Sequence, residues 1–399
     1  MGNFSLDPGQ QARCAEVRDL ARQHLAPLAE KGEQGRVNRP LVAELGRLGL
    51  LDRLFTSGAL DLCLMRESLA QVSTEAETAL ALQGLGAHPV HAHGTEAQRA
   101  RWLPEVRAGR AVAAFALSEP GAGSDAAALE LRATRQGRGA VSISGSAAGR
   151  DRSRRDPHPP TPQKWLLSGE KTWISNAPEA DFYTVFARTG DPGTRAGGVT
   201  AFLVPADRPG LTGAPLDMLS PHPIGTLTFD DVPVTADDVL GEPGAGFRVA
   251  MNTLNLFRPS VGAFAVGMAR AALDATLAHT ARREAFGGPL KDLQTVAHQV
   301  ADMALRVESA RLMVYAAASA YDEGADGVPR RAAMAKLLAT ETAQHVIDTA
   351  VQLHGARALR RGHLLEHLYR EVRAPRIYEG ASEVQRAIIA RELYKEETR

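Results

Sequence analysis

The segment 293-LQTVAHQVADMALRVESARLMV-314 decides the fold of this chain. Its apolar residues recur after alternating steps of three and four, at Leu293, Val296, Val300, Met303, Val307, Ala310 and Val314. This spacing places them along one face of a helix, where they suit packing against other long helices. The segment therefore predicts a long helix within a helical bundle.

Helical patterns continue on both sides of this segment. Residues 246–284, 330–354 and 381–394 predict three further helices, and Pro329 is well placed to begin the second of them. Together the four helices predict a C-terminal bundle. Near the N-terminus, Asp7 with Gln10, and Thr95 with Gln98, have the spacing of helix-start signals. The first third of the chain is therefore predicted to be helical as well.

The middle of the chain has a different sequence pattern, typical of short strands. Short segments rich in Val, Phe, Tyr and Thr alternate with Gly/Pro turns at 111–118, 139–146, 181–188, 198–205 and 226–232. Strands without intervening helices predict an antiparallel sheet or barrel. The expected fold is α+β, with an N-terminal helical domain (1–113), a middle β domain (114–236) and a C-terminal four-helix bundle (237–399). The Arg- and Pro-rich segment 145–163 is predicted to be a flexible surface insertion. The alternative is that its arginines dock a partner.

Composition narrows the class of protein. Lys plus Arg and Asp plus Glu each number 46 in 399 residues, which argues against a nucleic-acid partner. Cys14 and Cys63 form no CxxC pair, so we expect two buried free thiols and no metal site; the alternative is a single disulfide bridge between them. The first residues lack a basic start followed by an apolar run, and no 18-residue apolar stretch occurs. We therefore expect a cytoplasmic protein without a membrane span.

Some residues with reactive side chains have a plain interpretation. His88, His91 and His93 lie close together without a nearby acidic residue, so we expect a solvated helix end rather than a metal site. Lys336 and Arg331 are expected to be surface charges on a bundle helix.

Four motifs carry chemical groups. The first, 115-FALSEPGAGSD-125, follows a predicted strand and offers hydroxyls and close backbone approach at its glycines. The second, 169-GEKTWISNA-177, sets an aromatic ring beside a hydroxyl. The third is 282-RREAFG-287 followed by Gln294, and the fourth, 376-RIYEGASEVQR-386, places Glu379 at a helix entrance as a candidate base. Alone, the first could be a Gly-rich turn, the second a core tryptophan, and Glu379 a helix cap.

In this order and at these separations, the four motifs resemble the acyl-CoA dehydrogenase family. The resemblance runs from about residue 10 to residue 394, apart from the insertion. It implies FAD as the cofactor, with Ser118 and Ser175 bonding the isoalloxazine ring, Trp173 packing against it and Ser124 contacting the pyrophosphate. It also implies that Arg283, Phe286 and Gln294 reach the FAD of a neighbouring subunit. The full implied cofactor set adds Phe115, Leu117, Gly123, Gln352 and Gly355.

The same resemblance assigns the catalysis. Glu379 matches the base that removes the proton beside the thioester carbonyl. Some relatives place the base just before the arginine matching Arg258, but Phe257 stands there in this chain and cannot take a proton. With Phe257 and Arg258, Tyr378 and Gly380 are expected to contact the substrate.

The implied activity is FAD-dependent α,β-dehydrogenation of an acyl-CoA by a homotetramer, with an electron-transferring flavoprotein as acceptor. Three alternatives remain open from the sequence. One is a dehydrogenase acting on an acyl group held by an acyl-carrier protein. Another is an oxidase or monooxygenase on the same fold. The last is a non-catalytic assembly protein built on a helical bundle.

Overall fold

The computed structural model describes residues 6–136 and 163–397, and its first part is helical as predicted. The helices are α1 (Pro8–Leu20), which continues through a π-helical turn (Ala21–Leu25) into α2 (Ala26–Ala29), then α3 (Arg39–Arg47), α4 (Leu50–Thr56), α5 (Ala59–Ala70), α6 (Thr74–His93) and α7 (Glu96–Arg107). Both helix-start predictions are confirmed, because Asp7 with Gln10 and Thr95 with Gln98 each form a reciprocal capping box.

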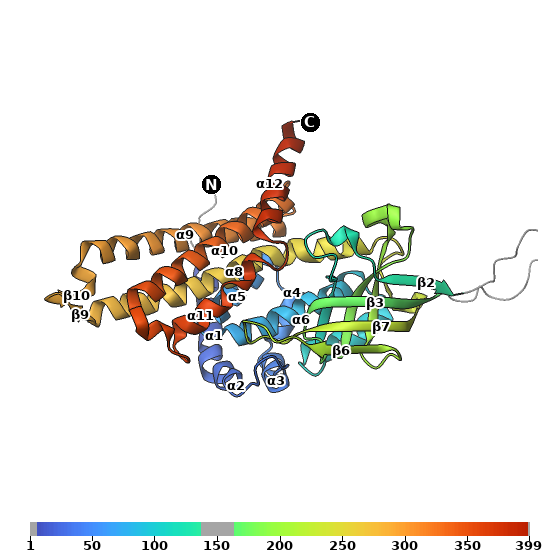
Figure 1. Ribbon diagram of the computed structural model, residues 1–399, viewed down its shortest axis with the longest axis horizontal. Coiled ribbons are helices and arrows are strands. Elements are labelled where there is room, and N and C mark those ends of the chain that lie inside the picture. Colours follow the sequence, from blue (N-terminus) through green and yellow to red (C-terminus); the bar gives the residue numbers. More distant parts are fainter. Residues whose placement is uncertain (1–5, 137–162, 398–399) are drawn as a thin grey trace, which may run out of the picture.

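The middle of the chain forms one eight-stranded sheet (Figure 1). Its strands are β1 (Ala113–Ala116), β2 (Arg132–Gln136), β3 (Lys164–Ser175), β4 (Phe182–Arg188), β5 (Val199–Pro205), β6 (Leu211–Pro215), β7 (Ile224–Thr235) and β8 (Val239–Leu240). They lie in the order β6-β7-β3-β2-β4-β5-β8, with β1 paired to β4.

The sheet is antiparallel except for the pairings of β1 and β2 with β4. The strand β1 pairs with β4 in parallel, and β2 adds one parallel contact between Arg132 and Arg188. The strand β1 follows α7, pairs with β4 in parallel and ends in the first motif. The strand predicted at 139–146, and nearly all of the insertion predicted at 145–163, lie outside the described residues.

The C-terminal part is helical. It contains α8 (Gly246–Arg282), a hairpin of β9 (Glu284–Ala285) and β10 (Gly288–Pro289), then α9 (Gln294–Asp322), α10 (Val328–His354), α11 (Leu364–Glu371) and α12 (Ser382–Glu397). The predicted apolar stripe lies in α9, where Val296, Met303, Val307, Ala310 and Val314 are buried. The predicted order of helices, sheet and helices is confirmed.

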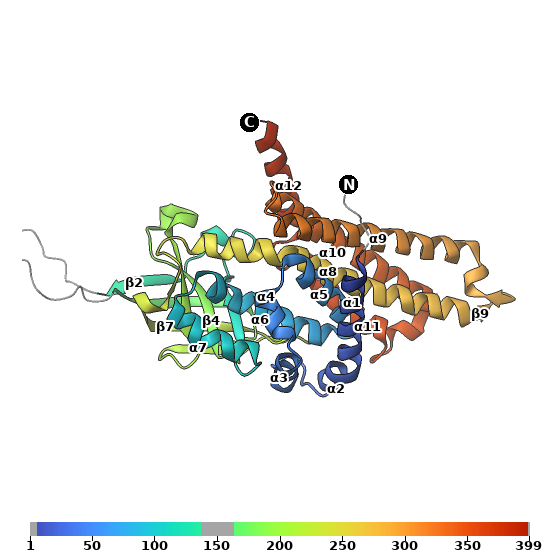
Figure 2. The ribbon, with the colours of Figure 1, turned by 180° about the vertical axis from the view of Figure 1, so that it is seen from behind.

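Helices α8, α9 and α10 pack on one another, and α5 of the N-terminal part packs against α8 and α9. Helix α12 begins against α10 and projects from the body, with the C-terminus at its tip (Figures 1 and 2). Helix α5 therefore packs alongside the C-terminal helices, and α12 joins them through α10. This arrangement brings α5, α6 and α8 together behind the loop that carries Glu379.

Helix α8 is long and apolar enough to cross a membrane, but 67% of its 18-residue apolar window is buried inside the protein. It packs against α5, α9 and α10, as a core helix does. Cys14 and Cys63 are both buried and free, as predicted.

Candidate active site

Glu379 lies in the tight turn that leads into α12. Its φ is +52° and that of Gly380 is +95°, a region of backbone conformation that a residue with a side chain rarely adopts. Three side chains hold this turn through its carbonyl groups. Arg258 Nε donates to the Glu379 carbonyl at 3.2 Å, while Lys336 Nζ and Gln385 Nε2 each donate to the Gly380 carbonyl at 2.8 Å. The strained turn is therefore fixed from α8, α10 and α12.

The prediction that Lys336 is a surface charge is wrong. Lys336 is fully buried, whereas Arg331 is exposed as expected. The lysine lies on the packed face of α10 with Ala332, Ala339 and Ala343. The spacing of these residues by three and four places them on one helix face, so the sequence could have predicted that Lys336 is buried. Burial lowers the pKa of Lys336 to about 8, and nearby Glu379 opposes this shift.

The Glu379 carboxyl group is partly withdrawn from solvent. Its Oε2 atom is buried and has no hydrogen-bond partner within the part of the chain that the structure describes. Desolvation by the surrounding protein raises the pKa of Glu379, against the opposing pull of Arg66, Arg258 and Lys336. A carboxylate with a raised pKa and a free oxygen is suited to act as a general base.

Phe257 forms part of the wall behind this turn. It is 1% exposed, and a Cβ atom on Gly84 of α6 would meet its ring at 2.8 Å, so glycine is required for this close approach. His88 packs edge-on against Phe257, with ring centroids 6.1 Å apart. The prediction of a solvated helix end is therefore wrong for His88, whose pKa burial lowers to about 4. No cluster of three metal-ligating side chains occurs within residues 6–136 and 163–397.

The first two motifs are joined directly. The Thr172 backbone N–H donates to the Ser118 carbonyl at 3.0 Å. Lys171 Nζ donates to the Leu117 carbonyl at 2.9 Å and to Glu119 Oε1 at 2.7 Å, and both side chains of this ion pair are buried. The sequence did not identify the Lys171–Glu119 pair, which locks the two predicted flavin segments together.

The polar and aromatic groups of these segments fit a flat polar cofactor. The Trp173 side chain is 56% exposed, Ser118 and Ser175 are partly exposed, and Ser124 is exposed. A Cβ atom on Gly123 would meet nothing within 4 Å, so its backbone is open to a ligand. In the same segment, Phe115 packs against Phe186 with ring centroids 4.8 Å apart and Leu117 is buried. These two residues can support a cofactor mainly through their backbone.

The other predicted cofactor residues lie elsewhere. They cluster where α8 ends, α9 begins and α10 ends, at the tip of the helical domain farthest from the sheet (Figure 1). The rings of His279 and His354 stack at 4.1 Å and tie the ends of α8 and α10 together. The cluster is solvent-exposed, with Phe286 at 92% exposure, and consists of Arg283, Phe286, Gln294, Gln352 and Gly355. One chain therefore does not bring its two groups of predicted cofactor residues together.

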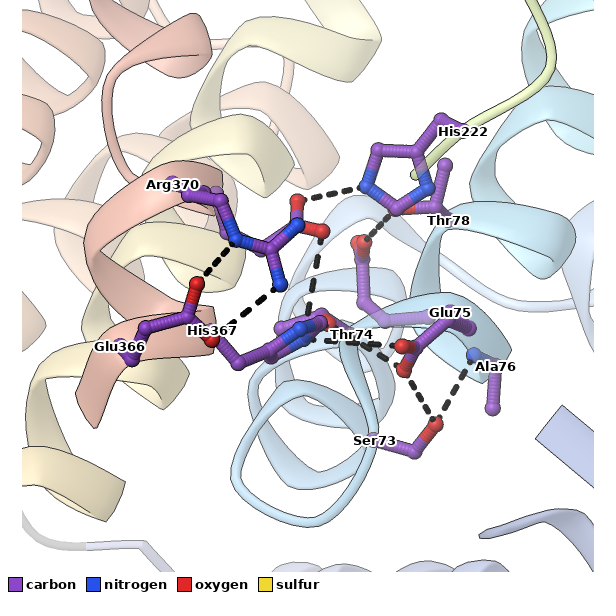
Figure 3. A network of polar contacts seen from close by, with 11 residues as sticks. Ser73, Thr74, Glu75, Ala76, Thr78, His222, Glu366, His367 and Arg370 are labelled. Atoms are coloured by element: carbon purple, nitrogen blue, oxygen red, sulfur yellow. Dashed lines mark hydrogen bonds and ion pairs between the residues drawn. The ribbon is translucent and has the colours of Figure 1, made fainter. Parts of the chain in front are cut away.

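A charged network lies between α6, α11 and the loop before β7 (Figure 3). His222 Nε2 lies 2.6 Å from Glu371 Oε2, and Thr74 Oγ1 lies 2.6 Å from His367 Nε2. Glu371 raises the pKa of His222, although burial opposes this effect and is the largest single influence. No motif in the sequence predicted this network.

The three parts of the chain each match a known protein domain, in the same order. Family models described as the N-terminal, middle and C-terminal domains of acyl-CoA dehydrogenase match residues 7–110, 114–232 and 244–394. The short-chain specific acyl-CoA dehydrogenase, mitochondrial, of Bos taurus is 36% identical over 95% of this chain and 88% of that protein.

Two solved structures extend the similarity to three dimensions. The butyryl-CoA dehydrogenase from Megasphaera elsdenii is 31% identical, with a TM-score of 0.85 over 98% of this chain and 100% of that one. A structure titled "PigA with FAD and proline" is 27% identical, with a TM-score of 0.86 over 98% of this chain and 99% of that one.

Proposed function

We propose that this chain, which belongs to the acyl-CoA dehydrogenase family, uses FAD to oxidise an acyl-CoA between the two carbons that follow the thioester carbonyl. Glu379 is the base in this proposal. The observation that carries it is the Glu379 carboxyl group, which combines an unpartnered buried oxygen with a raised pKa on a strained turn. A purely structural carboxylate would normally satisfy its buried oxygens with hydrogen bonds.

The residues around Glu379 have distinct roles in the proton transfer. The proton beside the thioester carbonyl moves to the Glu379 carboxylate, and negative charge develops on the carbonyl oxygen of the substrate. Arg258 and Lys336 hold the turn and keep positive charge close to it. Fixed positive charge in a partly desolvated site stabilises negative charge that develops during a reaction.

FAD is the proposed cofactor, and when bound it supplies the two-electron oxidising chemistry. Ser118, Ser124, Trp173 and Ser175 would hold it in one subunit, supported by the Lys171–Glu119 pair. The exposed cluster around Phe286 would complete the FAD site of a neighbouring subunit. Because the two groups lie apart in one chain, we propose a homo-oligomer, most simply the tetramer that the family resemblance implies. An electron-transferring flavoprotein is the proposed acceptor.

The experiment that tests this function is an anaerobic titration of the purified protein, followed through its flavin absorbance. Acyl-CoA and acyl-carrier-protein thioesters are compared, with Glu379→Gln as the test variant. Glu383→Gln is the matched control, because Glu383 is an exposed carboxylate on the first turn of α12.

We expect an acyl-CoA to bleach the flavin in the wild type and in Glu383→Gln, but not in Glu379→Gln with FAD still bound. Bleaching by carrier-protein thioesters alone would move the substrate to that class. A flavin that no thioester reduces, or a purified protein that takes up no FAD, would refute the proposal.

A further inference from the structure

The end of β3 that carries two of the proposed FAD contacts is irregular. Trp173 and Asn176 have φ values of +59° and +65°, a backbone conformation that residues with side chains rarely adopt. The register of β3 against β7 also shifts between Lys171 and Ile174. A strand end of this kind keeps its shape only where the surrounding structure holds it. Ser175 lies within this irregular end, so its position depends on what the strand end contacts.

The loop before β7 supplies those contacts. Ser175 pairs with Ile224, the first residue of β7. The Asn176 backbone N–H donates to the Pro223 carbonyl at 2.8 Å. A movement of this loop would therefore move the end of β3 with it.

His222 ties the same loop to the helices around it (Figure 3). Its Nε2 atom lies 2.6 Å from Glu371 Oε2 of α11 and 3.4 Å from Thr78 Oγ1 of α6. Glu371 is 1% exposed and is the last residue of α11. The loop of the sheet is therefore fixed to α11 through a hydrogen bond that is largely buried.

A short folded stretch of chain connects Glu371 to the proposed base. Glu379 follows Glu371 by eight residues. Between them, the backbone N–H groups of Ile377 and Tyr378 both donate to the Ala374 carbonyl, at 2.8 and 3.1 Å, so this stretch forms a compact turn. The contact between the loop and α11 thus joins the segment with the proposed FAD contacts to the segment with the base.

The surroundings of His222 are rich in charge and partly hollow. His222 lines a cavity of about 230 Å³ between the segment that follows α2, helix α6 and the loop before β7. The charged groups around its ring are Glu75 and Glu77 of α6 and Glu371 and His367 of α11, and Glu30, Glu33 and Arg36 line the same cavity. Burial lowers the pKa of His222, but the carboxylates, Glu371 foremost, raise it on balance.

We propose that His222 and Glu371 are positioning residues, whose contact fixes the end of β3 relative to the turn that carries Glu379. This inference rests on the proposed function, because it takes Ser175 as a contact of FAD and Glu379 as the base. A misplacement of about 1 Å between reacting groups can slow a reaction about 10²-fold. A contact that sets the spacing of two segments can therefore control the rate without touching the substrate.

The first test removes the imidazole and then restores it. We expect His222→Ala to keep its FAD but to reduce it about tenfold or more slowly with the thioester that reduces the wild type fastest. Because the missing side chain lined a cavity, free imidazole can enter beside Glu371 and should raise the rate again. The matched control is Glu366→Gln, since Glu366 is a carboxylate of α11 whose partner Arg370 lies on the same helix.

The control should react at the rate of the wild type and should not respond to imidazole. Reduction by His222→Ala at the wild-type rate, or an equal loss in Glu366→Gln, would overturn the proposal. A slow rate that imidazole leaves unchanged, together with loss of FAD, would assign His222 a structural role only and would also overturn it.

The second test uses Glu371→Gln, which keeps a hydrogen-bond acceptor and removes the charge. The charge-assisted contact in the wild type is complete at low pH and weakens as the pH rises through the raised pKa of His222. The rate of flavin reduction in the wild type should therefore fall on this alkaline side. In Glu371→Gln the fall should occur at lower pH, because the carboxylate that most raises the pKa of His222 is gone.

An alkaline fall at the same pH in both proteins would belong to another group, such as Lys336, and would overturn the proposal. This comparison decides the question even where His222→Ala does not fold. The failure of the proposed function is distinguishable from both results, because in that case no thioester reduces the flavin of the wild type.

Discussion

Replacement of Lys336 by methionine should separate the activity of this protein from its stability. Burial lowers the pKa of Lys336 from 10.5 to about 8. At neutral pH the charged ammonium therefore costs the folded state roughly 3 kcal/mol. Methionine removes that cost at similar volume. It also removes the charge-assisted hydrogen bond to the Gly380 carbonyl, worth about 1.5–3 kcal/mol. The two effects nearly cancel in the free energy of unfolding.

The activity of Lys336→Met should fall even though its stability does not. Loss of one of the three donors that hold the turn should lower kcat by about 10- to 100-fold, equivalent to about 1.4–2.8 kcal/mol. Removal of a cation that lowers the pKa of Glu379 should also move the acidic limb of the kcat/KM profile to higher pH. Steady-state kinetics across pH, thermal unfolding and FAD content are measured together, with the exposed Arg331→Met on the same helix as control. An unchanged kcat, or a loss of kcat matched by a large drop in melting temperature, would refute this reasoning.

Four other perturbations have defined outcomes. Lys171→Met removes the cation paired with the buried Glu119 carboxylate, which keeps its hydrogen bonds from the backbone N–H groups of Glu130 and Leu131, so chemical denaturation should show a loss of stability of about 3–5 kcal/mol and weaker FAD retention; equal stability would contradict this role. Gly380→Ala combines a φ of +95° with a Cβ atom 2.5 Å from Gln385 Nε2, so we expect lower kcat and a lower melting temperature. Phe286→Ala changes a side chain that is 92% exposed, so the unfolding of one chain should be unaffected while FAD content or the sedimentation of the oligomer falls; no change in either would count against the shared site. Lys336 and Lys171 both bind their protons more weakly in the folded state, so the unfolding free energy of the wild type should rise between about pH 8 and pH 10.5, and less so in Lys336→Met.

The sequence predicted the parts of the fold that depend on local pattern. The stripe from Val296 to Val314 and the two capping boxes at Asp7 and Thr95 are local signals, and both kinds were confirmed. The parallel pairing of β1 with β4 and the packing of α5 against the bundle are contacts between distant segments, which periodicity does not report.

In the candidate site as well, residues in local motifs could be predicted, whereas contacts made by packing could not. Glu379 could be proposed as the base because it lies within a contiguous motif. Lys336 was misread because lysine is usually exposed, although its place between buried alanines on α10 marked the packed face. No pattern in the sequence predicted the contact between Arg66 and Glu77. The contact forms only where α5, α6 and α8 pack together, and local sequence patterns do not report such packing.

The central claim, that Glu379 removes the proton beside the thioester carbonyl, is tested most directly by rapid anaerobic mixing of the protein with the thioester that bleaches its flavin fastest. The thioester is used with hydrogen or with deuterium on its α-carbon. We predict that deuterium slows flavin reduction in the wild type, and that reduction slows as the pH falls through the raised pKa of Glu379. Glu379→Gln should bind the thioester but reduce the flavin about 10²- to 10⁴-fold more slowly. Reduction in Glu379→Gln at nearly the rate of the wild type, with the same isotope effect, would contradict the assignment.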